Sequence, residues 1–564
     1  MKKLFILILC ILTAFTLIAC TAKPPMVSGG SDSNSQSNSQ SGSQSTTQTG
    51  SQTGSQSTGS DNTGDNTQTS YQNWFDDQTA KANTSFLSKY EASEQDLYYT
   101  LWEDTTKIIL KIDITPYELS KIEEAYEDYK RGNSLKADTY RKCSLTITVN
   151  GTDYYYEDVG IRMRGNTSRR NFCNQDGTIY SLVHFRFDLT ETFDGEEYQQ
   201  GAWANDIYTT WQDPALRSAR KDRTFATMEK FYYKWNKNYD NTYMREVYAN
   251  KMFQGYGVLA PHITLASLML KQNGKMENLG VGGLYETIDK RFIKRNFLPS
   301  EQGGDLYKCT YTLSPADLTE AKDYGVETPT QRFTYSLKTN NDRSAPDYQH
   351  NKDLKNFINV LKTSKSSTTF KTQLESVIDM DYFTRFEAVN YLLGNPDCIR
   401  NNANNYYLYF TPQGRAFLIP YDYDRCLGIN YDWNPSGNGM INIEPFSQYG
   451  ATGRINNPLY TKTILSGGIT EYKNMFKDSL AKLLETDWFN YQTFVTSYNN
   501  YFENYKDLAM PSQAIVNQIS GTIDCSLFYF GLGGAAENQY NSTRENISTA
   551  DYMRLKRITA EKYL

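Results

Sequence analysis

Histidine is almost absent from this chain of 564 residues, which has only His184, His262 and His350, at no metal-ligand spacing. Because histidine is the usual base of nucleophilic triads and a common zinc ligand, both kinds of site are disfavoured. The eight cysteines form no C-x-x-C pair, which argues against structural zinc, and no P-loop motif is present. Any chemistry must therefore use carboxylates, amides and basic residues.

An excess of positive charge is also lacking. The net charge is −6 and the sequence pI is about 5.5, so nothing indicates nucleic-acid binding. Aromatic residues are plentiful, with 45 Tyr and 7 Trp. Extracellular glycan-binding proteins are often aromatic-rich, although tyrosine also packs ordinary cores. A glycan-associated binding module therefore remains one alternative for the function.

The N-terminus predicts export. Two lysines precede an apolar run over residues 4–18, which is too short and wrongly flanked for a membrane span. The run ends in Leu-Ile-Ala-Cys, which resembles a bacterial lipobox, so we expect residues 1–20 to be a lipoprotein signal peptide and Cys20 to be lipidated. An ordinary signal peptide with a chance cysteine is the alternative. The expected location is the extracellular face of a bacterial cell membrane, held by the lipid anchor only.

A low-complexity segment follows the signal. Residues 28–70 contain only Ser, Gly, Asp, Asn, Gln and Thr, so they have nothing apolar to bury. We expect residues 21–70 to form a disordered tether, and as a flexible coil the part over 28–70 spans roughly 35 Å root-mean-square. The folded region is then 71–564, long enough for one two-lobed domain or two ordinary domains.

Hydrophobic periodicity predicts strands mainly in the first half of this region and helices in the second. Thr115 is a candidate cap for one helix, and Asn241 or Thr242 for another. The Asn150-Gly151 pair predicts a hairpin turn. The order of elements predicts an α+β fold with two lobes and a helical C-terminal extension over 458–564. Strands are expected at 107–114, 143–149, 154–164, 182–189, 263–270 and 281–287, and helices at 71–102, 116–131, 242–253, 351–362 and 379–393.

The most informative stretch is residues 394–428, which holds two polar clusters separated by a short hairpin. Asp397, Asn402 and Asn405 lie in the first cluster, and Asp422 and Asp424 in the second. Because a hairpin returns the chain, the two clusters are expected to lie close together. Carboxylate and amide oxygens suit a hard cation such as Mg²⁺, although a polar turn beside a core hairpin is the alternative.

Basic residues at strand ends offer contacts for phosphate. Arg164 closes a strand in the turn of G-I-R-M-R-G-N-T-S, and Arg186 lies among apolar neighbours in H-F-R-F-D. Either arginine can equally be a solvated or structural side chain. Glu286 ends a strand in G-G-L-Y-E-T-I-D, where it either orients a basic residue or is an ordinary surface carboxylate.

Taken together, these segments resemble the CotH-type spore-coat kinase family in the same order and at comparable spacing. The matching pieces are G-I-R-M-R-G-N-T-S, H-F-R-F-D-L, D-N-T-Y-M-R-E-V-Y-A-N-K-M-F-Q-G-Y-G-V, G-G-L-Y-E-T-I-D-K-R-F, G-N-P-D with N-N-Y-Y-L-Y-F, and F-L-I-P-Y-D-Y-D-R-C-L-G. The resemblance is clearest over 97–470, within a kinase domain expected over 71–564. The chain has no H-R-D motif, so it is not an ordinary protein kinase.

The resemblance implies an atypical protein-kinase-like fold that transfers phosphate from ATP, with Mg²⁺ or Mn²⁺, to Ser or Thr of secreted or coat proteins. Asp397 is then the catalytic-loop aspartate, Asp422 binds metal and Asp424 is a second metal candidate. The family places its metal-binding asparagine five residues after the catalytic aspartate, where this chain has Asn402. Asn405, which precedes the tyrosine-rich strand, lies at eight, so either the loop is longer or Asn402 is the ligand.

On this reading Arg164, Arg186 and Glu286 belong to the nucleotide site. The expected partner is a Ser/Thr-rich secreted or surface protein. Two alternatives remain open. One is a non-catalytic surface assembly or glycan-associated scaffold of the same family, suggested by the tether and the altered asparagine spacing. The other is a glycosidase, since glycoside hydrolysis also uses two carboxylates.

Overall fold

The computed structural model describes residues 80–132, 139–165, 168–193, 214–312, 314–320, 323–328, 330–340, 351–429, 440–447, 456–537 and 547–564. The predicted signal peptide, Cys20 and the tether over 21–70 lie outside the described residues, as do Asn166 and Thr167. No helix within the described ranges is long and apolar enough to cross a membrane.

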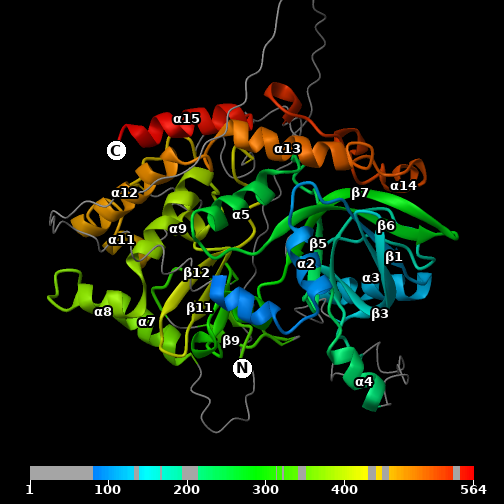
Figure 1. Cartoon of the computed structure of the whole chain (residues 1–564), viewed down its shortest axis with the longest axis horizontal. Helices are drawn as coiled ribbons and strands as arrows, with labels where there is room; N and C mark the ends of the chain where they lie inside the picture. Colours follow the sequence, from blue (N-terminus) through cyan, green and yellow to red (C-terminus); the bar gives the residue numbers. More distant parts are fainter. Residues whose placement is uncertain are drawn as a thin grey trace, which may run out of the picture. The chain divides into compact units, whose positions relative to one another are not determined.

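Seven strands close into a barrel in the order β1-β2-β3-β4-β5-β7-β6 (Figure 1). All neighbours are antiparallel except β1 and β6, which close the barrel in parallel. Strand β1 alternates buried and partly exposed positions, with Ile108, Leu110 and Ile112 inside. The strands are β1 (Ile108–Asp113), β2 (Arg141–Val149), β3 (Thr152–Arg164), β4 (His184–Asp188), β5 (Lys230–Trp235), β6 (Ile263–Gln272) and β7 (Lys275–Glu286).

The predicted strands of this region are confirmed, and β5 is an addition that the periodicity did not reveal. Asn150 and Gly151 both have positive φ, as a two-residue hairpin turn requires, so the predicted turn between β2 and β3 is confirmed as well. Strand β5 was missed because its sequence, Lys-Phe-Tyr-Tyr-Lys-Trp, is too short and aromatic to show a clear period.

A second sheet has the order β12-β11-β8-β10-β9. Its hairpin β11–β12 pairs Tyr406 with Pro420 and Phe410 with Ala416, and both strands are buried throughout. This pairing confirms the predicted hairpin and returns the chain from the first polar cluster to the second. The strands are β8 (Leu306–Cys309), β9 (Tyr324–Gly325), β10 (Tyr335–Leu337), β11 (Tyr406–Phe410) and β12 (Ala416–Pro420).

Helices dominate the rest, and after residue 458 the described chain contains no strand. Helix α9 is buried along its whole length and packs against α12 and α5, as Figure 1 shows. The helices are α2 (Ala92–Leu101), α3 (Pro116–Lys130), α4 (Pro214–Lys221), α5 (Arg245–Gly255), α6 (Lys290–Asn296), α7 (Lys352–Lys362), α8 (Phe370–Val377), α9 (Met380–Leu393), α10 (Ile399–Asn402), α11 (Pro458–Lys462), α12 (Thr470–Glu485), α13 (Tyr491–Tyr505), α14 (Gln513–Ile519) and α15 (Thr549–Glu561).

Two of the predicted helix caps can be compared with the structure. Thr115 caps α3 by accepting a hydrogen bond from the Glu118 amide at 3.2 Å, which confirms the prediction. At the start of α5 the Thr242 hydroxyl accepts from the Met244 amide at 3.1 Å, and Asp240 accepts from the Arg245 amide at 3.0 Å. Of the two predicted candidates, Thr242 therefore contacts the beginning of the helix and Asn241 does not. The Asp240 carboxylate reaches the amide of Arg245, five residues later. The side-chain amide of Asn241 instead donates to the Leu527 carbonyl.

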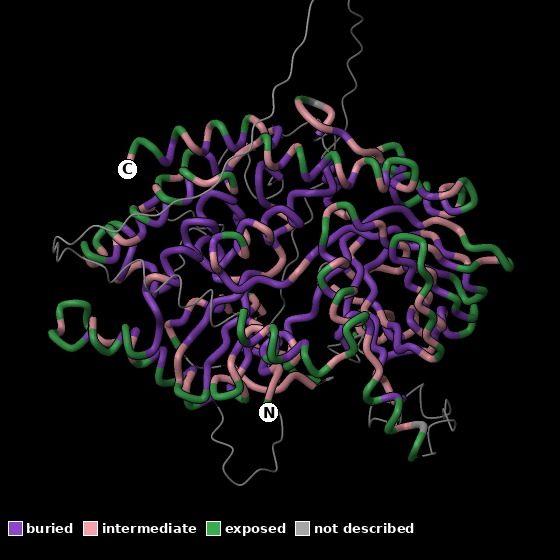
Figure 2. The backbone as a smooth tube through the Cα atoms, viewed as in Figure 1, coloured by how far each residue is buried: buried purple, intermediate pink, exposed green. Residues whose placement is uncertain are grey.

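Figure 2 shows the buried positions in the interior of the described chain. The buried hydrophobic residues form two clusters. One fills the barrel and is covered by α2, α3 and α14. The other joins α5, α9, the second sheet and the C-terminal helices. The mixed α+β class is therefore confirmed, with a β-rich first part and a last part that is helical in the residues described. The middle of the chain differs from the expectation, because the second sheet runs through it.

A buried ion pair joins the end of β7 to α6. The side chains of Glu286 and Arg295 form a salt bridge, and each is 2% exposed. Glu286 also accepts a hydrogen bond from the His262 amide at 3.0 Å. Removal of one partner leaves an uncompensated buried charge. The pair is therefore a structural connection between the barrel and the following helix.

We predict that Glu286→Ala lowers the free energy of unfolding by about 3–5 kcal/mol, because Arg295 loses its counter-charge. Urea unfolding of the purified chain measures this. The control is Asp113→Ala, which breaks an exposed pair with Lys271 and should cost less than about 1 kcal/mol. Equal losses in the two variants contradict the structural role of Glu286.

Candidate active site

A cavity of about 1220 Å³ lies between the barrel strands and the second sheet. Residues from β3, β4 and β5 line it on one side, and residues from β8 and the loops around β11 and β12 on the other. Asp397, Asp422 and Asp424 all line it, as do Arg164 and Arg186. The structure thus brings most of the predicted site residues to one place.

Lys234 lies at the centre of the charged residues. Its ammonium contacts Glu246 at 2.9 Å, Asp422 at 2.5 Å and Asp424 at 3.1 Å. Burial opposes the charge of Lys234, but the three carboxylates outweigh it and raise its pKa well above the usual value. One cation from the barrel therefore holds a carboxylate from α5 and two from the loop after β12.

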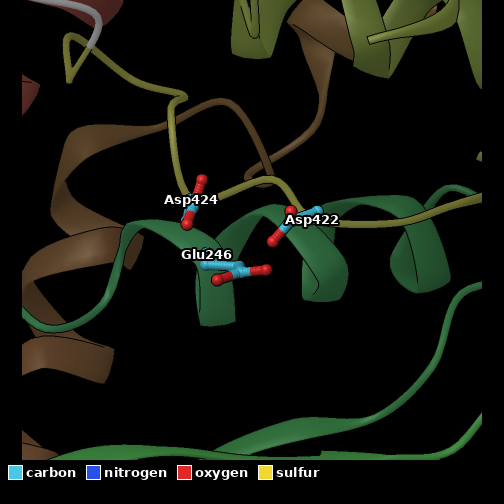
Figure 3. A group of neighbouring side chains, drawn as sticks. All are labelled: Glu246, Asp422 and Asp424. Carbon is cyan, nitrogen blue, oxygen red and sulfur yellow. The ribbon is translucent and has the colours of Figure 1, made fainter. Parts of the chain in front are cut away.

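The three carboxylates converge from two segments. Figure 3 shows Glu246 on helix α5 and Asp422 and Asp424 on the loop that passes over it, with their carboxylates turned toward one another. One oxygen from each lies within 4.8 Å of the others. Burial raises the pKa of Glu246 to about 7, although Lys234 lowers it. Burial also acts against the Asp422 carboxylate, but the Lys234 ammonium keeps its pKa well below the ordinary value.

Asp397 lies in the turn between α9 and α10 and is held by three asparagines. The side-chain amide of Asn402 donates to its carboxylate at 2.6 Å, and those of Asn404 and Asn405 donate at 2.9 Å each. Burial raises the pKa of Asp397 to about 6, and the hydrogen bonds from Asn404 and Asn402 act in the opposite direction. The carboxyl is therefore fixed in position and titrates near neutrality.

The structure places both candidate asparagines at Asp397. Helix α10 ends at Asn402, and Ala403, with a φ of +46°, and Asn404 lie between Asn402 and Asn405. The side-chain amides of Asn402 and Asn405 both reach the Asp397 carboxylate, so the choice of metal ligand between them stays a prediction. In this structure the Nδ2 atoms of both residues serve Asp397.

The two acidic segments are also linked through the backbone. Asn395 accepts from the Asp397 amide at 2.9 Å, and its own amide donates to the Asp422 carbonyl at 3.4 Å. Asp422 has a φ of +61°, which is uncommon for a residue with a side chain. Such strained positions concentrate at functional sites, where the surrounding structure maintains them.

Arg164 lies deep in the cavity. Its guanidinium stacks 3.4 Å from the ring centroid of Tyr232 and donates to the Tyr421 hydroxyl at 2.7 Å. Lys308 donates to the same hydroxyl at 3.4 Å. Burial works against the phenolate form of Tyr421, but these two cations lower its pKa. Arg164 and Lys308 thus add positive charge directly beside Asp422.

Arg186 and Glu286 have different surroundings. Arg186 lies on β4 opposite Tyr232 of β5 and lines the cavity, as expected for a nucleotide contact. Glu286 does not line the cavity, since it is buried against Arg295 on the other side of the β7 strand end. The sequence predicted that Glu286 either orients a basic residue or is a surface carboxylate. It does orient a basic residue, Arg295, but that residue is structural, so the prediction that Glu286 belongs to the nucleotide site is wrong.

The donor set fits a divalent metal ion. Three carboxylate oxygens within 4.8 Å are hard oxygen ligands, and they already gather around a positive charge, the Lys234 ammonium. Asp422 and Asp424, together with Glu246, are the residues that would hold Mg²⁺ or Mn²⁺. An ion there would supply charge neutralisation for phosphate oxygens.

Sequence reasoning missed Lys234, Glu246 and Lys308. Lys234 escaped attention because strand β5 was not predicted, and Glu246 because its segment was interpreted as architecture. A usable signal existed, since Lys234 and Glu246 form a strand lysine followed twelve residues later by a helix glutamate. That order is the one in which protein kinases present their lysine–glutamate ion pair.

Comparison with protein families agrees with this geometry. The model of the CotH kinase protein family matches residues 161–509, which is more than half of the chain. The chain therefore belongs to the CotH kinase family. The matched range begins on β3 and includes every residue that lines the cavity. A comparison with curated proteins finds no match.

We predict that Mn²⁺ or Mg²⁺ stabilises the chain, by about 2.7 kcal/mol at 100 times its Kd. Asp422→Asn and Asp424→Asn should each weaken metal affinity by at least about tenfold, because a charged ligand is lost. Thermal unfolding with and without metal measures the effect.

Asp289→Asn is the matched control, because it alters another aspartate of the same cavity. Asp289 caps α6, and asparagine caps a helix equally well. If all three variants respond to metal like the wild type, the cluster around Lys234 is not the metal site.

Proposed function

We propose that this chain is a kinase that transfers the γ-phosphate of ATP to Ser or Thr hydroxyls of secreted or surface proteins. The observation that carries the proposal is the contact of Lys234 with both Glu246 and Asp422 in the cavity that also contains Asp397. The lysine, the glutamate, the loop aspartate and the metal-binding aspartate occur in the same chain order as in protein kinases. On this proposal the barrel and the helical part correspond to the two lobes of a kinase-like fold.

Phosphoryl transfer requires positioning and charge neutralisation more than a covalent nucleophile. Asp397 accepts the proton of the acceptor hydroxyl, whose oxygen forms a bond to the γ-phosphorus while the bond to the β-phosphate oxygen breaks. The asparagines that donate to Asp397 fix the direction of its carboxylate. Lys234 and Arg164, which lie beside Asp422 and Tyr421, are the cations that contact the phosphates.

The location is also part of the proposal. On this proposal residues 1–20 are a lipoprotein signal peptide, Cys20 carries the lipid anchor, and the kinase lies on the outer face of a bacterial cell membrane. Its acceptor is then a Ser/Thr-rich secreted, coat or surface protein. A non-catalytic scaffold of the same family is the competing function. It requires no metal, no ATP and no aspartate that accepts a proton.

The decisive test is transfer of labelled phosphate from ATP with Mg²⁺ or Mn²⁺ to a Ser-rich acceptor, including a peptide of residues 28–70. Asp397→Ala should reduce the rate by at least about 10²-fold, because it removes the proton acceptor. Asp422→Ala should abolish transfer. An ATP-dependent thermal shift that persists in Asp397→Ala shows that the variant is folded. No label and no ATP-dependent shift in the wild type contradict the kinase and favour the scaffold.

The pH dependence gives a separate prediction. Because the pKa of Asp397 is raised to about 6, the carboxyl is protonated and inactive as a base below that pH. The transfer rate should therefore rise as the pH increases through about 6. Asn404→Ala removes a hydrogen bond that favours the carboxylate, so the rising limb should move to higher pH.

A pH–rate profile of wild type and variant measures this. Asn401→Ala is a suitable control, because the Asn401 amide donates to the Asn395 carbonyl and not to Asp397. A limb that stays at the same pH in Asn404→Ala contradicts the assignment of the titration to Asp397.

A further inference from the structure

The lining of the cavity has the opposite charge to the chain. Among the described residues that line it, thirteen are Lys or Arg and six are Asp or Glu. The whole chain carries a net charge of −6. Three of the six acids are Asp397, Asp422 and Asp424 of the reaction centre, so the remainder of the lining is strongly basic.

Part of this charge lies far from the metal cluster. Lys230 and Lys234 are on the same face of β5 and four residues apart, which corresponds to about 13 Å along a strand. At the Lys230 end, α6 adds Lys290 and Lys294, both exposed, while Arg186 projects from β4. We name Arg186, Lys230, Lys290 and Lys294 the basic wall.

The acids near the basic wall already have partners. Glu229 pairs with Arg291 at 2.5 Å and more weakly with Lys290 of the wall at 3.9 Å, and Asp289 accepts from the backbone amides that begin α6. Lys230 forms a salt bridge with Asp188 at 2.5 Å, so part of the positive charge of Lys230 is already neutralised. The Nε atom of Arg186 is buried and has no hydrogen-bond partner in the described part of the chain.

The sheet register also concentrates positive charge here. Arg186 of β4 lies directly opposite Arg162 of β3. Like charges in directly opposed positions destabilise a sheet, and an anion bound between or beside them relieves the repulsion. Both arginines line the cavity, so their cross-strand pairing favours an anionic ligand on this face.

ATP alone does not account for the basic wall. The charge of ATP is on its triphosphate, which is engaged near Lys234, whereas its nucleoside is neutral and is better served by apolar and aromatic groups. The cavity of about 1220 Å³ also exceeds the roughly 300–1,000 Å³ usual for one small ligand. A second, anionic ligand fits both the surplus volume and the surplus charge.

We propose that the basic wall binds the acceptor, and that the acceptor is an acidic polypeptide segment with carboxylate or phosphate groups beside the Ser or Thr that is modified. This inference rests on the proposed kinase function and specifies its substrate class. Charge complementarity of this kind selects partners and accelerates their association.

The test uses one Ser-containing peptide in three forms, with flanking Glu, Gln or Lys, and measures kcat/KM for each. The wild type should prefer the Glu form, and the preference should decrease with added salt because the contacts are exposed. A fourth form with flanking phosphoserine distinguishes phosphate from carboxylate recognition, and a preference for either anion supports the proposal.

The variant is Lys290→Glu with Lys294→Glu, which should lower kcat/KM for the Glu peptide by about three- to tenfold or more, as expected for two lost ion pairs. It should favour the Lys peptide and leave the KM for ATP unchanged. The matched control is Lys271→Glu with Lys275→Glu, two exposed lysines of the β6–β7 hairpin outside the cavity lining, which changes the net charge equally.

Two results overturn the proposal. One is a wild type with no preference among the peptides, and the other is a variant whose KM for ATP rises while its peptide preference is unchanged. Binding of a fluorescent Glu peptide, measured by anisotropy without ATP, separates this inference from the kinase function. If transfer fails but Lys290→Glu with Lys294→Glu weakens peptide binding, the anion-binding site is supported without the kinase function. If neither transfer nor binding is seen, both proposals are wrong.

Discussion

The contact of one ammonium with three carboxylates is the interaction on which the rest of the site depends. Lys234 comes from the barrel, Glu246 from α5, and Asp422 and Asp424 from the loop after β12. Each of these charges is costly to bury alone, and together they satisfy one another. The arrangement therefore fixes the position of the barrel strand, the helix and the loop at the same point.

A second buried pair organises the other half of the site. Arg400, three residues after Asp397, forms a salt bridge with Glu387 of α9, and both side chains are at most 2% exposed. Arg400 also donates to the Pro445 carbonyl at 2.6 Å, and Tyr460 of α11 donates to Glu387 at 2.8 Å. The loop that carries Asp397 is thus attached to α9, to the segment after Asp422 and to the C-terminal helices.

Much of the barrel could be predicted from the sequence because strand alternation and turn residues act locally. The positions of β1, β2, β3 and the Asn150-Gly151 turn follow from such patterns. The presence of Asp397 and Asp422 in one cavity was also predictable, since one hairpin connects their segments. Glu286 shows the limit of this reasoning, because its place at a strand end gave no sign that Arg295 covers it. Asn241 failed as a cap of α5 for the same reason, since its side-chain amide donates to the carbonyl of Leu527, 286 residues away.

Three features could be inferred from the amino-acid sequence alone, namely the α+β class, the hairpin that joins the two acidic clusters, and the resemblance to the CotH family. These depend on residues close together in the chain or on motifs read in order. The folded chain was needed to find that Lys234 contacts both Glu246 and Asp422, that three asparagines donate to Asp397, and that the cations of β4, β5 and α6 line one wall. Those contacts join segments up to 188 residues apart, as between Lys234 and Asp422, and the energy that selects them comes from burial and charge pairing in the folded chain.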